Sequence, residues 1–149
     1  MPVHLKVMGH KGLVRGESSY RSGTGWFDVL GTVQTSRVNV APGRGSFSGT
    51  SSRSEDMQDA SFALAFATGS RQLLDLYVDG KRMKWALLQW TDGSAPLFWC
   101  LYRDAWFGTS QIYPDRDDKG LEIRLSLLAD EIRIGMGTVI TAGGLLLVP

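Results

Sequence analysis

LEIRLSLLADEIRIGM, residues 121–136, decides the fold because its apolar and polar side chains alternate. In the first half the apolar residues fall on every second position from Leu121 to Leu127, and in the second half they do so from Ile132 to Met136. A period of two is typical of a strand with one buried face and one exposed face. The stretch therefore predicts two amphipathic strands, and the same period recurs through much of the chain.

Strands account for most of the remaining pattern. They are predicted at residues 3–8, 26–30, 33–40, 74–78, 83–90 and 97–107. Asp79-Gly80, between two of these strands, is typical of a type I′ hairpin turn. Eight to ten strands with one helix predict a mainly β protein: a closed or nearly closed antiparallel β-barrel of two packed sheets, with one short α-helix on the outside.

A single helix is expected from Asp59 to Gly69. Asp59 is a good N-cap, alanine is the best helix former, and glycine is common just after a helix. Phe62 and Phe66 would share one face of that helix. A buried strand is the alternative interpretation, since Phe62, Leu64 and Phe66 also alternate.

Charge and hydropathy exclude several classes of protein. Sixteen basic and fifteen acidic residues give the 149-residue chain a net charge of +1, which offers no basis for binding nucleic acid. No run approaches the roughly 18 apolar residues that cross a bilayer, so membrane insertion is not expected. The N-terminal residues lack the apolar segment of a cleavable signal peptide. We therefore expect a cytoplasmic protein which, if exported, leaves without such a leader.

Catalytic and metal-binding patterns are weak. His4 and His10 have no Cys, Asp or Glu at metal-ligand spacing, and the 43–49 glycine-rich loop lacks the lysine of a phosphate-binding loop. Cys100 stands in the most apolar strand, where a thiol is usually inert. The five tryptophans are spread over several strands, which favours packing over a stacking platform. We expect no enzyme, no cofactor and no metal.

A family resemblance runs along residues 3–136. HLKVMGHKG, then GES, a polar loop and WFDVL resemble the start of the haemolysin-coregulated protein (Hcp) family, the tube subunits of type VI secretion systems. The long Gly/Ser loop, the 59–69 segment and the later strands are similar to that family in order. Leu13-Val14-Arg15 is an insertion, and Gly31 to Thr35 replaces a tryptophan-rich run.

The resemblance implies an assembly. Members of the Hcp family form hexameric rings that stack into a hollow tube. A contracting sheath propels this tube together with a spike, and effector proteins are held in the lumen of the tube. For this chain it implies a homohexamer that is cytoplasmic before assembly and is then secreted. A tail-tube protein of a phage-like contractile injection system is one alternative. A monomeric β-barrel that binds an apolar ligand is another, from a different class.

Two domain segments and a set of contact residues complete the expectations. Residues 1–136 would form the barrel, and the apolar residues 137–149 an extra strand or a clamp on a neighbour. The stretch from Leu97 to Tyr102 is apolar on both faces, so we expect the helix or another subunit to cover one of them. Loop 41–56, with Arg37 beside it, is expected to join stacked rings, and loop 16–25 to lie at a ring face. The candidate subunit or stacking contacts are Arg44, Phe47, Arg53, Glu55, Phe98, Cys100, Tyr102, Leu145 and Leu147.

Overall fold

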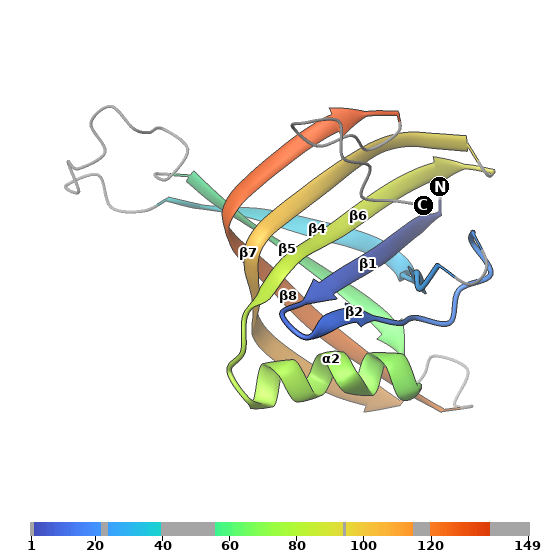
Figure 1. Ribbon diagram of the computed structural model, residues 1–149, viewed down its shortest axis with the longest axis vertical. Coiled ribbons are helices and arrows are strands. Elements are labelled where there is room, and N and C mark those ends of the chain that lie inside the picture. The colour runs from blue at the N-terminus through green and yellow to red at the C-terminus, as the bar shows by residue number, and fades with distance from the viewer. Residues whose placement is uncertain (1, 22–23, 40–55, 94, 115–119, 138–149) are drawn as a thin grey trace.

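One curved antiparallel sheet forms the body of the protein (Figure 1). The computed structural model describes residues 2–21, 24–39, 56–93, 95–114 and 120–137. The elements in these residues are β1 (Val3–Gly9), β2 (Gly12–Val14), β3 (Phe27–Asp28), β4 (Leu30–Asn39), β5 (Asp56–Ala65), α2 (Thr68–Val78), β6 (Met83–Asp92), β7 (Ala95–Pro114) and β8 (Leu121–Met136). The strand order is β2-β1-β6-β7-β8-β5-β4, with β3 paired to β1. The mainly β class with a helix is confirmed, but the strands form one sheet instead of two.

The two edges of the sheet approach each other where β3 meets β4. Leu5 of β1 pairs with Phe27 of β3. Leu30, which follows the end of β3 by two residues, pairs with Ala63 of β5. Between them the Val29 N–H donates to the Val3 carbonyl at 3.0 Å. Within the described residues no ladder joins β4 to β1, so hydrogen bonds do not close the barrel.

The fold-deciding stretch is one long strand, not two. β8 pairs with β7 along its length, from Leu121 to Met136, and with β5 only from Glu122 to Leu127. Ladder pairing with β7 continues at Leu128 and Ala129, where the alternation is interrupted, and resumes at Glu131. Side chains on the inward face of the sheet, together with α2, make the core. Its members include Leu5 of β1, Leu88 of β6, Tyr102 of β7, Leu125 of β8 and Leu73 of α2.

The helix predicted from Asp59 to Gly69 is wrong over most of its length. Residues 56–65 are β5, and Phe62 and Leu64 enter the core opposite Leu125 and Ile123 of β8. Burial of alternate side chains against a neighbouring strand outweighs the helix propensity of alanine, which is worth only tenths of a kcal/mol per residue. The strand interpretation of this segment is confirmed.

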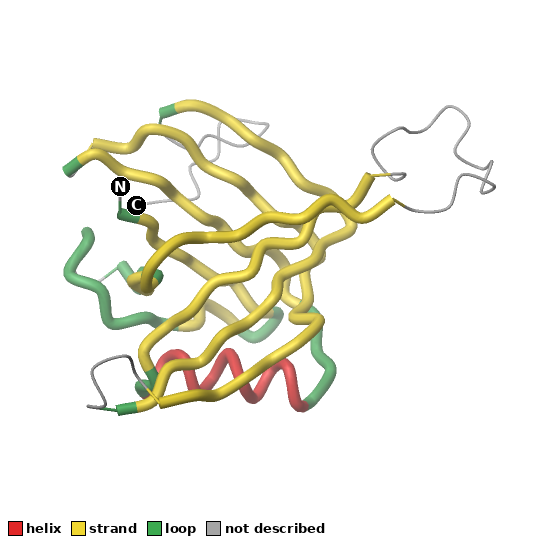
Figure 2. Tube along the Cα trace, turned by 180° about the vertical axis from the view of Figure 1, so that it is seen from behind, coloured by secondary structure: helices red, strands yellow, loops and turns green. Residues whose placement is uncertain are grey.

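The helix instead occupies the segment predicted as the 74–78 strand. α2 lies across one end of the curved sheet, as the ribbon in Figure 1 and the Cα tube in Figure 2 both show. Asp79-Gly80 ends this helix and does not form a hairpin: Gly80 has φ +63°, its N–H donates to Tyr77, and the Lys81 N–H donates to Leu76 at 3.0 Å. These two bonds define a Schellman motif, in which glycine takes the left-handed position.

Candidate functional site

The segment between β2 and β3, residues 15–21 and 24–26, forms a strap across the outward side of the sheet. The strap doubles back on itself, because the Gly16 N–H donates to the Gly25 carbonyl and the Ser18 N–H to the Trp26 carbonyl, each at 2.9 Å. A Cβ on Gly16 would stand 2.3 Å from the Trp26 carbonyl oxygen. The turn therefore requires glycine at position 16.

Trp26 and Phe27, adjacent aromatic residues at the end of the strap, pack on opposite faces of the sheet. Successive side chains of an extended chain point to opposite sides. Phe27 enters the core, whereas Trp26 is fully buried on the outward side against Leu87 and Leu101. Tyr20 and two further tryptophans, Trp85 and Trp99, pack around this outer cluster.

The strap thereby covers the second apolar face of the Leu97–Tyr102 stretch. Leu101 is 3% exposed in the single chain and lies in the outer cluster under Trp26. The prediction that the helix or another subunit covers this face is wrong for Leu101, because the chain covers it with its own strap.

Polar groups fasten the strap to β1. His4 Nδ1 lies 3.0 Å from Asp28 Oδ1, the Ser18 hydroxyl donates to the same oxygen at 2.5 Å, and the Tyr20 N–H donates to Ser18 Oγ at 2.9 Å. The Tyr20 ring stacks on His4 with centroids 4.1 Å apart. Burial lowers the pKa of His4, and the adjacent Asp28 carboxylate opposes that shift. Serine and histidine both bond the carboxylate, which makes this a clamp and not a nucleophile with its base.

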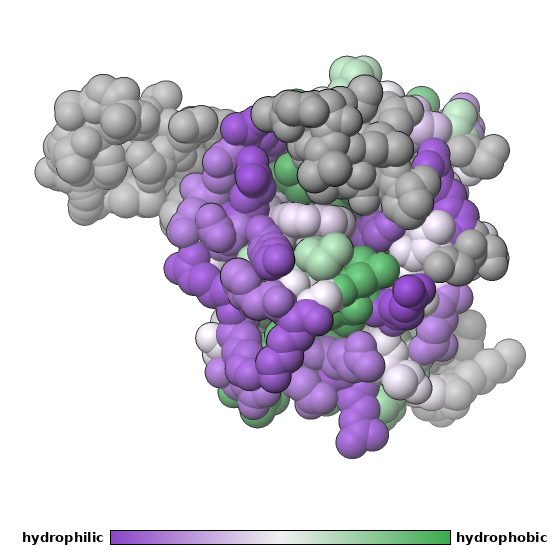
Figure 3. Space-filling model, viewed as in Figure 1, coloured by the Kyte–Doolittle hydropathy of each residue, from purple (hydrophilic) through white to green (hydrophobic). Residues whose placement is uncertain are grey.

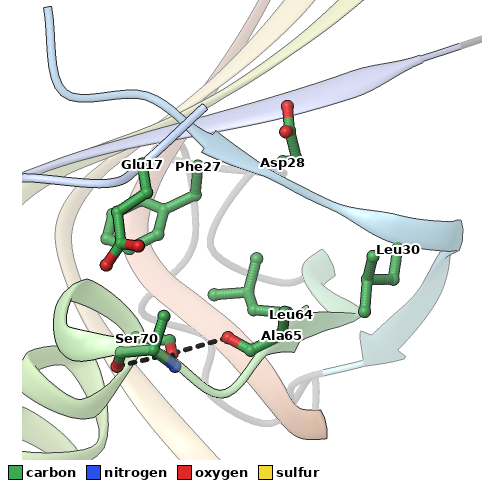
Figure 4. Close-up of a pocket in the computed structure, with 8 residues that line it drawn as sticks. Glu17, Phe27, Asp28, Leu30, Leu64, Ala65 and Ser70 are labelled. Atoms are coloured by element: carbon green, nitrogen blue, oxygen red, sulfur yellow. Dashed lines mark hydrogen bonds between the residues drawn. The ribbon is translucent and has the colours of Figure 1, made fainter. Parts of the chain in front are cut away.

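A pocket of about 240 Å³ opens at the seam between the strand segment 27–30 and the start of α2 (Figure 4). Its walls are mostly apolar, from Phe27, Leu30 and Leu64 together with two alanines. In Figure 4 the Asp28 carboxylate points away from Leu64, and Glu17 points toward the start of the helix. The pocket thus offers a small apolar space with polar groups at its helix end.

Those polar groups are already used by the fold. Ala67, the N-cap residue of α2, has no side-chain acceptor, and the Gly69 N–H donates instead to Glu17 Oε1 at 3.3 Å. Ser70 Oγ accepts from the Ala67 N–H at 2.8 Å and donates to the Ala65 carbonyl at 2.7 Å. A carboxylate at a helix N-terminus is favourable, so Glu17 ties the strap to α2.

The described residues show little that suggests catalysis. No group of three or more His, Cys, Asp or Glu side chains among them is placed to hold a metal ion. Burial raises the pKa of the Cys100 thiol to about 11, so it is protonated at neutral pH and is a poor nucleophile. No helix in the described part of the chain is long and apolar enough to span a membrane.

Three of the predicted contact residues fall within the described structure. Phe98 is half-buried and stacks on Trp90, with ring centroids 4.6 Å apart. Cys100 and Tyr102 are buried in the core, so their side chains do not reach the surface of the single chain. The side chain of Arg37 and the six remaining candidates, Arg44, Phe47, Arg53, Glu55, Leu145 and Leu147, lie outside the described residues.

The C-terminal half of β8 exposes apolar side chains that the sequence analysis did not single out as contacts. Ile134 is 64% exposed and Met136 80%, on a segment that pairs with β7 but, among the described residues, with no strand on its other side. Where the atoms in Figure 3 are not grey, the face drawn there is mainly hydrophilic, with a small hydrophobic group near its centre. Exposed apolar side chains beside an open strand edge are typical of an interaction surface.

The fold is that of the Hcp proteins of type VI secretion systems. No protein-family model matches the sequence, and no curated protein matches it. Solved structures match nearly the whole chain. A double variant of Hcp1 from Escherichia coli EAEC 042 superposes with a TM-score of 0.70 at 14% identity, over 100% of this chain and 98% of that one.

Two further structures give the same result. Hcp3 from Pseudomonas aeruginosa, described as a secreted protein, has a TM-score of 0.64 at 17% identity and covers 97% of this chain and 93% of its own. Hcp2 from Salmonella typhimurium has a TM-score of 0.65 at 13% identity and covers 100% of this chain and 93% of its own. The resemblance found in the sequence is confirmed at the level of the fold.

Proposed function

We propose that this protein is a structural tube subunit of a type VI secretion system, and not an enzyme. Copies would form hexameric rings that stack into an inner tube, with effector proteins carried in the lumen and sheath and spike components as further partners. The protein would be made in the cytoplasm and secreted through the apparatus. The observation that carries the proposal is the Hcp fold over the full length of the chain.

The surface of the single chain supports an assembly. A protomer that exposes an open strand edge and, elsewhere, a different complementary patch makes head-to-tail contacts, which close into a ring when the rotation permits. β8 offers such an edge next to Ile134 and Met136. We assign the other contacts to Phe98, loop 41–56 and residues 137–149, with that last segment acting as a clamp on a neighbour.

Particle mass in solution tests the proposal. Sedimentation velocity and light scattering of the purified full chain are expected to give a particle of about six times the 16.4 kDa protomer mass. Negative-stain images should show rings with a central hole. A particle that stays at the protomer mass at high concentration contradicts the tube function and would instead favour the ligand-binding barrel.

A further inference from the structure

The pocket between the strand segment 27–30 and the start of α2, here named the seam pocket, has room for a partner's side chain. Its volume is about 240 Å³, and Phe27, Leu30 and Leu64 form most of its walls (Figure 4). An apolar cavity of about 150 Å³ holds a molecule the size of benzene, so one or two aliphatic side chains fit the seam pocket. Its polar residues Glu17 and Ser70 already bond within the chain. The pocket therefore favours an apolar occupant.

The surface at the mouth of the seam pocket is accessible in the single chain. Leu30 is half-buried and Ala65 is exposed, and both line the pocket. Phe66, which follows Ala65, is 40% exposed, and its N–H donates at 2.8 Å to the carbonyl of Leu121, itself 46% exposed. Exposed apolar side chains at the same end of the sheet as an apolar pocket are typical of a surface that a partner covers.

The C-terminal segment 138–149 has the chemistry that this pocket favours. Its twelve residues include no charged side chain, and residues 145–147 are three consecutive leucines. The segment begins at the end of β8, where the Gly137 N–H donates to the Leu97 carbonyl at 2.8 Å. Twelve extended residues span about 40 Å. That length is comparable with the width of a domain of this size, whose radius of gyration is about 15 Å, so the segment is long enough to extend onto a neighbouring copy.

On the basis of the proposed tube function, we propose that the leucines at 145–147 of one copy dock into the seam pocket of the next copy in the ring. The segment and the pocket are different parts of the protomer, as head-to-tail contacts in a ring require. A docked leucine is buried against Phe27 and Leu64, and the removal of apolar surface from water holds the two copies together. The seam pocket is thus the receiving surface of the C-terminal clamp.

Engineered cysteines test this contact in the full chain. Ala65→Cys places a thiol at the exposed rim of the pocket, and Leu147→Cys places one on the segment. Bonded cysteines hold their Cβ atoms about 4 Å apart, so the disulfide reports close approach. After mild oxidation of the double variant, a non-reducing gel is expected to show a ladder from dimer to hexamer. Each single variant should run mainly as a protomer. Val78→Cys combined with Leu147→Cys, with the first thiol at an exposed position near the end of α2, is the matched control and should give no ladder.

A charge at the pocket rim gives a second measurement that needs no cross-link. Ala65 is exposed, so Ala65→Arg should leave the protomer folded, which urea denaturation checks. Ala65→Arg and Leu147→Arg are each expected to raise the concentration at which copies associate by about tenfold or more, as loss of one buried leucine side chain would. Val78→Arg should associate as wild type does.

Sedimentation of the same samples separates failure of the docking from failure of the tube function. If rings form but the double cysteine variant gives no ladder and Ala65→Arg associates as wild type does, the docking is overturned and the tube function stands. A disulfide within one chain, seen as a faster protomer band, also overturns the docking, because the segment then occupies the pocket of its own copy. Absence of rings in the wild type contradicts the tube function, and the docking with it.

Discussion

Gly69 stands where α2 comes closest to the strap. A Cβ at this position would lie 2.3 Å from the Arg15 carbonyl oxygen and 2.9 Å from Phe27 Cε2. Overpacking of this kind costs up to about 3 kcal/mol, whereas alanine gains only about 1 kcal/mol in helix propensity. Gly69→Ala is therefore expected to lower the free energy of unfolding by about 2 kcal/mol, measured by urea denaturation. Gly120→Ala meets nothing within 4 Å and is the matched control, and equal stability of the two variants would contradict the clash.

Lys6 makes stability depend on alkaline pH. Its pKa falls from 10.5 to about 8 in the folded protein, so between these values the unfolded chain holds more protons. Stability then rises with pH across that window, and the gain is lost as pH falls back through about 8. Urea denaturation from about pH 7 to about pH 10 should show this rise in wild type and in the control Lys84→Met, which removes an exposed lysine from β6. Lys6→Met should be more stable than wild type at neutral pH, and a rise with pH that survives in Lys6→Met would assign that rise to another group.

At the scale of elements, strands with long alternation were predictable and the helix was not. β1 and both halves of β8 follow directly from a period of two, because one face of each meets the core. Residues 59–69 satisfied both helix and strand rules, and the ladder with β8, distant in sequence, decided between them. In residues 74–78, Leu76 and Tyr77 pack against the core from a helix, with Leu73 buried one turn earlier. Their spacing of three and four was masked by the equally clear alternation of Leu74, Leu76 and Val78.

The open edge of β8 gives the prediction that belongs to this scale. Ile134→Lys places a charge on a side chain that is 64% exposed, so the stability of the protomer should change by no more than about 0.5 kcal/mol. In an assembly the same charge would be buried without a partner, and we expect rings to dissociate to protomers in sedimentation velocity. Val78→Lys, at a side chain 70% exposed on α2, is the control and should leave the rings intact. If Ile134→Lys still forms rings, the edge of β8 is not part of the interface between copies.

For the whole molecule, the sequence indicated the fold through the order of short motifs but did not reveal the strap contacts. The stretch from Leu97 to Tyr102 was correctly recognised as apolar on both faces. Its cover comes from Trp26, more than seventy positions earlier, and a separation of that size leaves no periodic signal in the sequence. The outward face around Leu87 and Leu101 is consequently covered within the single chain. In the assembly proposed above, we therefore expect contacts at the ends of the strands and in the segments that follow them.

The segment after β8 tests that conclusion for the whole molecule. Among the described residues the core cluster runs from Val3 to Ala129, so we expect a chain without residues 138–149 to unfold cooperatively in urea. If 137–149 clamps a neighbour, the shortened chain should sediment as a protomer, because the apolar side chains that join copies are gone. Rings formed by the shortened chain would exclude the clamp. Loss of cooperative unfolding would instead indicate that residues 137–149 form a strand within their own protomer. Such a strand would pair with the open edge of β8 and leave that edge unavailable to a neighbouring copy.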